Sequence, residues 1–174
     1  MAIERIYLIG MPGVGKSSLG KRLAQKLQWQ WIDLDEQIEE KAGQNVSSLF
    51  NEHGEAFFRN LEQTVLKESF AQTACVISCG GGTISYSNNM QLINENGFSI
   101  YLSASLAFIK QRVLQGKELR PLFKGLDEKE IIEKIKVLLA QRDPFYRQAK
   151  LEISIPQKDA NALFNKALEL IQRA

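Results

Sequence analysis

Short, mainly apolar segments alternate with longer segments of spaced apolar positions along the chain. The short segments are typical of strands buried on both faces of a sheet. They lie at residues 3–9, 31–34, 75–78, 98–102 and 151–155. The spaced positions predict helices at residues 16–27, 55–72, 88–94, 106–114, 128–141 and 160–171.

Strands that alternate with helices favour an α/β fold, in which helices cover both faces of a parallel sheet. Each connection between parallel strands is then right-handed. We therefore expect three layers around a five-stranded parallel sheet flanked by helices. No internal repeat or linker divides the chain, so residues 1–174 are predicted to form a single domain.

One segment interrupts this alternation. Residues 116–127 carry a glycine near each end, a proline and three basic side chains, without a sustained helix or strand pattern. A loop of this length inside a compact domain is more often functional than structural. We predict a mobile lid here.

Composition and charge narrow the possible classes of protein. Hydrophobic residues make up 44% of the chain, and the net charge of +2 gives no basic field for nucleic acid. No apolar run reaches the roughly 18 residues of a membrane-spanning helix, and the first residues do not form a secretion signal. Cys75 and Cys79 are the only cysteines and suit free thiols in a reducing compartment. We expect a cytoplasmic monomer that binds neither nucleic acid nor membrane.

The first predicted strand leads into the sequence Gly-Met-Pro-Gly-Val-Gly-Lys-Ser at residues 10–17. This segment matches the phosphate-binding pattern G-x-x-x-x-G-K-[ST] in full, and it opens a predicted helix. Its glycines let backbone N–H groups face phosphates, and the helix N-terminus adds partial positive charge. We expect Lys16 to reach the β- and γ-phosphates of ATP and the Ser17 hydroxyl to bind Mg²⁺. The motif leaves the phosphoryl acceptor open.

Two carboxylates, Asp33 and Asp35, follow the second predicted strand. On an extended chain, residues two apart project from the same face. Strand ends of an α/β sheet line the ligand crevice, so both side chains are predicted to face the phosphate loop. One could hold Mg²⁺ through water while the other accepts a hydrogen bond from an attacking hydroxyl. Alternatively, they cap a helix that begins near Glu36.

A second group of charged residues follows Gly54. Glu55, Arg59 and Glu62 are spaced i, i+4 and i+7, so they share one stripe of a helix. Carboxylates on both sides would hold the guanidinium ready for a planar anion such as a carboxylate. A surface ladder of ion pairs is the alternative.

Three further features lie near predicted element ends or in the lid. Gly80, Gly81 and Gly82 directly follow a strand, which indicates either a tight turn or a backbone that approaches a ligand closely. Arg120 could bring positive charge onto a transferring phosphoryl group when the lid closes. Arg142 lies at the end of a predicted helix, where it either stabilises that end or binds an anion.

Taken together, these motifs resemble the shikimate kinase family from residue 3 to about residue 151. In chain order, the matching pieces are the GMPGVGKS loop, D-x-D at Asp33 and Asp35, G-E-x-x-F-R ending at Arg59, the triple glycine, R-P-L at Arg120 and R-x-P-x-Y at Arg142. The resemblance implies a P-loop kinase fold. It also implies transfer of the γ-phosphoryl group of ATP to the 3-hydroxyl of shikimate, a step towards chorismate and the aromatic amino acids.

The resemblance further implies roles for individual residues. Asp35 would bind the ring hydroxyls and act as the base, while Arg59 and Arg142 would clamp the carboxylate and Gly80 to Gly82 would add backbone contacts. Asp33 would support Mg²⁺ through water beside Ser17. The predicted catalytic residues are Lys16, Asp35 and Arg120. The predicted ATP contacts are Gly13, Val14, Gly15, Lys16, Ser17, Ser18, Arg112, which would stack on the adenine, and Arg120.

Two other functions remain open from the sequence. Another small-molecule kinase of the same fold, such as a gluconate or nucleoside-monophosphate kinase, would also use paired arginines. A regulatory switch that binds ATP without useful turnover is the alternative from a different class.

Overall fold

The computed structural model of the chain describes residues 3–115, 121–123, 125–156, 165 and 168–169. Its strands form one parallel sheet in the order β2-β3-β1-β4-β5. Their bounds are β1 Arg5–Ile9, β2 Gln30–Asp33, β3 Cys75–Ser78, β4 Phe98–Ala104 and β5 Leu151–Ile155. The predicted five-stranded parallel sheet is confirmed, with strand ends displaced by at most two residues.

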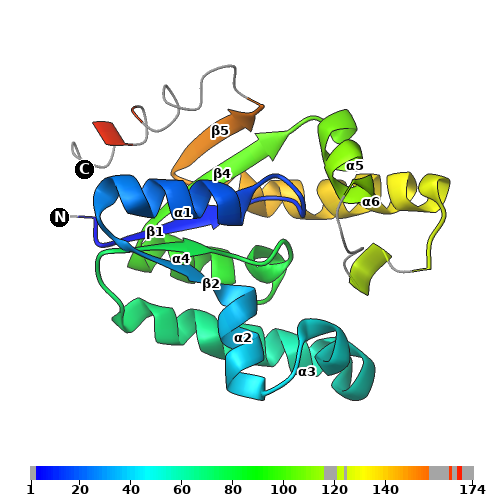
Figure 1. Cartoon of the computed structure of the whole chain (residues 1–174), viewed down its shortest axis with the longest axis horizontal. Coiled ribbons are helices and arrows are strands. Elements are labelled where there is room, and N and C mark those ends of the chain that lie inside the picture. The colour runs from blue at the N-terminus through cyan, green and yellow to red at the C-terminus, as the bar shows by residue number, and fades with distance from the viewer. Residues whose placement is uncertain (1–2, 116–120, 124, 157–164, 166–167, 170–174) are drawn as a thin grey trace.

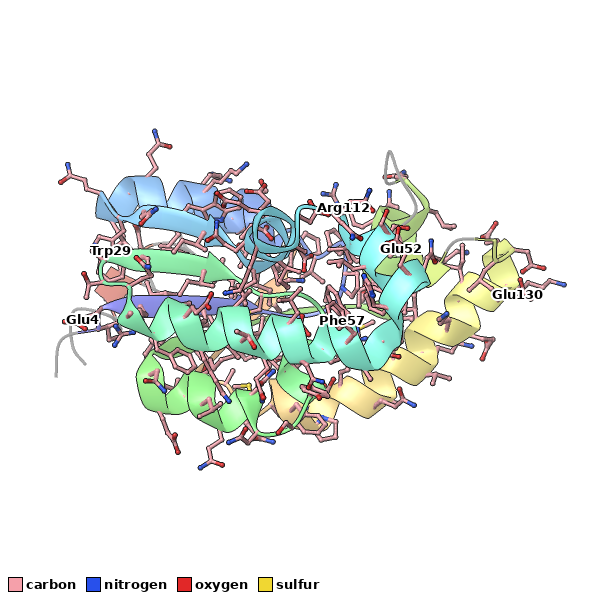
Figure 2. All side chains as sticks on the ribbon, turned by 90° about the horizontal axis from the view of Figure 1, so that it is seen from below. Glu4, Trp29, Glu52, Phe57, Arg112 and Glu130 are labelled. Carbon is pink, nitrogen blue, oxygen red and sulfur yellow. The ribbon has the colours of Figure 1, made fainter. Side chains whose placement is uncertain are left out.

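Helices cover both faces of this sheet. Their bounds are α1 Lys16–Leu27, α2 Leu34–Ala42, α3 Val46–Glu68, α4 Asn89–Asn96, α5 Leu106–Leu114 and α6 Glu128–Tyr146, with short 3-10 turns at Ser69–Ala71, Thr83–Ser85 and Pro121–Phe123. Helix α1 contacts β1, β2 and β3, whereas α4 contacts β4 and lies on the opposite side of the sheet (Figures 1 and 2). Strands β1, β3 and β4 are buried along most of their length because each has a neighbour on both sides.

The register of the strands decides what meets at their carboxyl ends. Leu8 of β1 pairs with Ser78 of β3, and Ser78 pairs with Asp33 of β2. Two residues beyond each of these paired positions, the chain reaches Gly10 after β1, Gly80 after β3 and Asp35 after β2. The phosphate loop, the triple glycine and the second carboxylate are therefore neighbours, although the sequence separates them by tens of residues.

The region between β2 and β3 is more helical than the sequence indicated. Helix α2 was expected only through the alternative in which an aspartate caps a helix near Glu36, and α3 extends back to Val46, beyond the segment predicted from residue 55. The side chain of Asn45 caps α3 by accepting a hydrogen bond from the backbone of Ser48 at 2.8 Å. Gly54, with φ of 80°, kinks the helix, so the turn that carries Glu52 is directed away from the longer part (Figure 2). Gly54 is not helical, with ψ of 172°, so a separate helical segment begins at Glu55 as the sequence predicted. The turns of α3 that the sequence did not predict are those before Gly54.

Helix α6 also differs from its prediction, because it continues through Pro144 to Tyr146. Pro144 lies in the last turn, so the helix loses a single backbone donor near its end. The predicted helix end at residue 141 is wrong, and Arg142 lies inside the helix. Of the predicted lid, Leu122, Phe123 and residues 125–127 are described, whereas Arg120 and nearly all of the predicted helix at 160–171 lie outside the described residues.

Two global features of the described residues bear on the sequence analysis. Neither Cys75 nor Cys79 forms a disulfide, and both are buried, as the sequence predicts. None of the helices in the described part of the chain is both long and apolar enough to span a membrane.

Candidate active site

The phosphate loop connects β1 to α1 and adopts the backbone conformation that its glycines permit. Gly15, directly before α1, has φ of 96°, and Gly13 has φ of 84°. Side chains rarely tolerate these values. Val14, between the two glycines, is buried, whereas Ser18 is exposed on the first turn of α1. The loop thus places the N-terminus of α1 at the carboxyl end of the central strand, where an anion is stabilised.

Lys16 crosses this loop from the first position of α1. Its ammonium donates hydrogen bonds to the carbonyl oxygens of Gly10 at 2.8 Å and Met11 at 3.1 Å, and the residue is only 7% exposed. These bonds hold the positive charge over the concave side of the loop. A phosphate bound by the loop's N–H groups would therefore meet a preplaced cation.

Asp33 joins the phosphate loop to α2. Its Oδ2 accepts a hydrogen bond from the Ser17 hydroxyl at 2.7 Å, while its Oδ1 accepts one from the backbone N–H of Asp35 at 3.0 Å and so caps α2. The capping interpretation of this carboxylate is therefore confirmed, and the bond to Ser17 is compatible with the predicted role at Mg²⁺, which stays a prediction. The expectation that Asp33 and Asp35 project from one face of an extended chain is wrong, because the helix begins between them at Leu34.

The oxygens of Ser17 and Asp33 fit Mg²⁺, which prefers hard oxygen ligands. In the described part of the chain, no group of three or more His, Cys, Asp or Glu side chains could hold a metal ion. An ion beside Ser17 would thus need water and nucleotide phosphates to complete its coordination. Mg²⁺ bound together with ATP satisfies that requirement.

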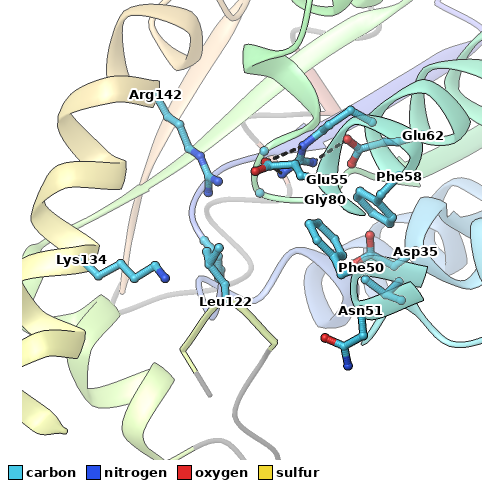
Figure 3. Close-up of a pocket in the computed structure, with 15 residues that line it drawn as sticks. Asp35, Phe50, Asn51, Glu55, Phe58, Glu62, Gly80, Leu122, Lys134 and Arg142 are labelled. Atoms are coloured by element: carbon cyan, nitrogen blue, oxygen red, sulfur yellow. Dashed lines mark hydrogen bonds and ion pairs between the residues drawn. The ribbon is translucent and has the colours of Figure 1, made fainter. Parts of the chain in front are cut away.

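A cavity of about 410 Å³ lies next to the phosphate loop. Helix α6 contributes Arg142 and Lys134 from one side, while Asp35, Phe50 and Phe58 line the other (Figure 3). The lining residues come from six separate segments of the chain. They are Pro12, Asp35, Val46, Phe50, Asn51, Glu55, Phe58, Arg59, Glu62, Gly80, Gly81, Gly82, Leu122, Lys134 and Arg142. Pro12 belongs to the phosphate loop, so the cavity opens beside the expected position of the ATP γ-phosphate.

Arg59 is held in this cavity by carboxylates on both sides, as its helical spacing predicts. Its Nη1 donates to Glu62 Oε2 at 2.6 Å and its Nε to Glu55 Oε1 at 3.3 Å (dashed in Figure 3). Glu62 is only 1% exposed, and its other oxygen accepts a hydrogen bond from the buried Thr83 hydroxyl at 2.5 Å. The ion pair of Arg59 with Glu62 is therefore part of the cavity wall and is held in place by Thr83. It is not a ladder of ion pairs on the surface.

The triple glycine forms a turn that packs closely against charged side chains of the cavity, whereas its predicted contact with a ligand stays a prediction. A Cβ at Gly80 would lie 2.8 Å from Glu62 Oε1 and 3.1 Å from Asp35 Oδ1, and a Cβ at Gly82 would lie 2.6 Å from an Arg59 nitrogen. Any larger residue would displace these functional side chains. The Gly81 carbonyl accepts a hydrogen bond from the buried Tyr146 hydroxyl at 2.6 Å, which ties the turn to α6.

Arg142 is a buried cation of the cavity with one unsatisfied donor atom. The residue is 6% exposed, and its Nη1 has no hydrogen-bond partner among the described residues. Burial lowers the pKa of its guanidinium. The side chain points from α6 into the cavity (Figure 3). A buried donor without a partner is costly, and an anionic group in the cavity would remove that cost.

The predicted adenine contact, Arg112, lies near the end of α5 beside the phosphate loop. Its Nε donates to the Gly13 carbonyl at 3.4 Å, and a Cβ at Gly13 would lie 3.2 Å from the Arg112 Cβ. The structure thus brings Arg112 to the nucleotide side of the site. Arg120, predicted to act on the phosphoryl group, lies outside the described residues.

Several lining residues were missed by reasoning from the sequence. Lys134 lies two turns before Arg142, and the i, i+4, i+8 row of Lys134, Leu138 and Arg142 could have revealed it. Phe50 and Asn51 belong to the unpredicted first part of α3. Leu122 belongs to the R-P-L motif of the predicted lid, but no local pattern indicates that its side chain lines the cavity.

Comparison with known proteins connects this geometry to one family. The family model for shikimate kinase matches residues 12–172. A shikimate kinase from Sulfurihydrogenibium sp. is 37% identical over 98% of this chain and 99% of its own length. The crystal structure of shikimate kinase from Bacteroides thetaiotaomicron superimposes with a TM-score of 0.91 at 35% identity, covering 98% of this chain and 99% of the other.

Another solved structure is shikimate kinase from Acinetobacter baumannii in complex with shikimate. It has a TM-score of 0.88 at 34% identity and covers 98% of this chain and 94% of its own. A gluconokinase from Sinorhizobium meliloti has a TM-score of 0.63 at 16% identity over 98% of this chain and 92% of its own. At that identity the likeness concerns the fold alone.

Proposed function

The chain belongs to the shikimate kinase family, and from this premise we propose that it transfers the γ-phosphoryl group of ATP to the 3-hydroxyl of shikimate. The products are shikimate 3-phosphate and ADP. The observation that carries the proposal is one cavity beside the phosphate loop. It combines Arg59, the carboxylate of Asp35 and an Arg142 donor that has no partner among the described residues. A substrate that is both a carboxylate and a polyol needs these groups together.

On the acceptor side, the two arginines bind the substrate carboxylate. Arg59 is held by Glu55 and Glu62, so its guanidinium is ordered before the substrate arrives. Arg142 supplies a second cation whose burial strengthens its attraction for an anion. Asp35 aligns the attacking hydroxyl and accepts its proton, while the turn at Gly80 to Gly82 contacts the ring.

On the donor side, the phosphate loop and Lys16 bind the β- and γ-phosphates of ATP. Ser17 and, through water, Asp33 would hold Mg²⁺, which would neutralise charge on the phosphate oxygens. Gly13, Val14, Gly15 and Ser18 add contacts around the phosphates. Arg112 packs against the nucleotide base, and Arg120 reaches the transferring group when the lid at residues 116–127 closes.

Transfer in line within one ternary complex follows from this arrangement. The acceptor cavity and the phosphate loop adjoin at Pro12, so the hydroxyl oxygen and the γ-phosphorus can approach without a covalent enzyme intermediate. Positioning and electrostatics account for the catalysis. Apolar side chains such as Phe50 and Phe58 limit the access of water, which otherwise competes as an acceptor.

The test is a coupled ADP-release assay with shikimate, gluconate and nucleoside monophosphates as acceptors. We expect kcat/KM for shikimate to exceed that for each other acceptor by at least about 10³-fold. A ring holds the carboxylate and hydroxyls of shikimate in fixed positions, whereas gluconate is a flexible open chain and nucleoside monophosphates carry no carboxylate. Preference for gluconate or a nucleotide would overturn the proposed acceptor. ATP binding without turnover of any acceptor would favour the regulatory switch instead.

A further inference from the structure

Lys134 is a cation of the acceptor cavity to which neither the sequence motifs nor the proposed mechanism gives a role. It lies on α6 and directs its half-buried side chain into the cavity, on the same side as Arg142 (Figure 3). No hydrogen bond or ion pair of Lys134 is found within the described part of the chain. Lys136, two residues further along, is instead exposed and pairs with Glu133 at 2.5 Å.

The charges that line the cavity explain why a third cation matters. Three lining side chains are acidic, namely Asp35, Glu55 and Glu62. Three are basic, namely Arg59, Lys134 and Arg142, so the lining is neutral overall. Without Lys134 the same lining would carry a net charge of −1 and would repel an anion.

Two of the three carboxylates that line the cavity form ion pairs with Arg59 and not with Lys134. Glu55 and Glu62 both bind Arg59, which makes that group of three negative by one charge. The single positive charge of Arg142 can neutralise either this excess negative charge or the substrate carboxylate, but not both. Lys134 has no carboxylate partner among the described residues. It can therefore supply the additional positive charge that an anionic acceptor needs when it enters the cavity.

We propose that Lys134 binds the anionic acceptor and sets the preference of the cavity for a substrate that carries a carboxylate. The inference rests on the proposed function and adds a substrate-binding residue to it. An ammonium group is a compact charge on a flexible stem, so Lys134 acts through attraction more than through fixed geometry. Its effect should appear in acceptor binding, not in the chemical step, and should weaken with salt.

The experiment compares Lys134→Met, Lys134→Arg and the matched control Lys136→Met in steady-state kinetics. We expect Lys134→Met to raise KM for shikimate about five-fold, with kcat and KM for ATP unchanged within about two-fold. Lys134→Arg retains the charge and should restore KM, and Lys136→Met should match wild type. High salt should reduce the difference between Lys134→Met and wild type.

Three results would overturn the assignment. They are an unchanged KM for shikimate in Lys134→Met, an equal effect in Lys136→Met, or an increase confined to KM for ATP. Titration of each variant with shikimate by calorimetry separates this inference from the proposed function. If wild type binds shikimate without turning it over, the proposed function fails, whereas the difference in affinity between wild type and Lys134→Met still decides the role of Lys134.

Discussion

The phosphate loop and the acceptor cavity adjoin in space but are built in opposite ways. The loop is one continuous stretch, residues 10–17, whose backbone and single lysine form the anion site between β1 and α1. The acceptor cavity takes side chains from α2, α3 and α6, together with the backbone of the glycine turn after β3. A site made from local backbone can be identified from a motif, whereas a site made from distant side chains depends on how the elements pack.

This contrast predicts different kinetic effects in the two regions. Changes in the loop should impair the use of ATP with every acceptor. Changes in the cavity should alter the use of shikimate and leave ATP binding nearly intact.

The largest effect is expected from Lys16→Ala. It removes the cation that lies over the loop, and turnover should fall by about 10³-fold or more because that charge stabilises the phosphoryl oxygens. Steady-state turnover with saturating substrates measures the loss. Lys21→Ala, on the exposed surface of α1, is the matched control and should keep wild-type turnover. Comparable turnover in both variants would remove Lys16 from the mechanism.

Asp35→Asn should reduce kcat by about 10²-fold, because the amide cannot accept the proton of the attacking hydroxyl. KM for ATP should remain near its wild-type value, since Asp35 faces the acceptor cavity. Glu36→Gln, at the next and exposed position of α2, is the control. An equal loss in Glu36→Gln would assign the effect to the helix and not to the carboxylate.

Arg142→Met should raise KM for shikimate by about ten-fold or more, because it removes a buried donor that has no partner among the described residues and would bind the substrate carboxylate. The comparison is with Arg147→Met, whose exposed side chain pairs with Asp143 outside the cavity. Shikimate titration by calorimetry gives the affinity directly. If ATP affinity falls and shikimate affinity does not, the carboxylate role of Arg142 is wrong.

The smallest effect is expected from Thr83→Val, which nearly conserves volume but removes the hydroxyl that supports Glu62. A less firmly held Glu62 lets Arg59 move, so KM for shikimate should rise about three-fold with little change in kcat. Thr83→Ser should restore KM. Thr64→Val, an exposed threonine on the same helix as Arg59, serves as control. No change in Thr83→Val would show that Arg59 is held well enough without this bond.

The errors of prediction in the fold have identifiable physical causes. Helix α2 is only nine residues long, and its start is fixed by the capping carboxylate of Asp33, which the sequence also allowed as a metal-site residue. Gly54 does interrupt α3, as the prediction of a helix start at Glu55 required, and the unpredicted part of α3 is the segment before it. Packing of α3 against α2 holds helical turns on both sides of that break.

By itself, the sequence determined the alternating strands and helices, the phosphate loop and the stripe of Glu55, Arg59 and Glu62, because each depends on residues only a few positions apart. It could not decide that Asp33 caps α2 while it also bonds Ser17. Nor could it decide that Arg142 is buried with a donor that has no partner among the described residues, or that Lys134 faces the same cavity. Those facts depend on the parallel register, which brings Gly10, Asp35 and Gly80 to one level, and on the packing of α6 beside them. Burial and charge balance are properties of that assembly, and no short segment contains them.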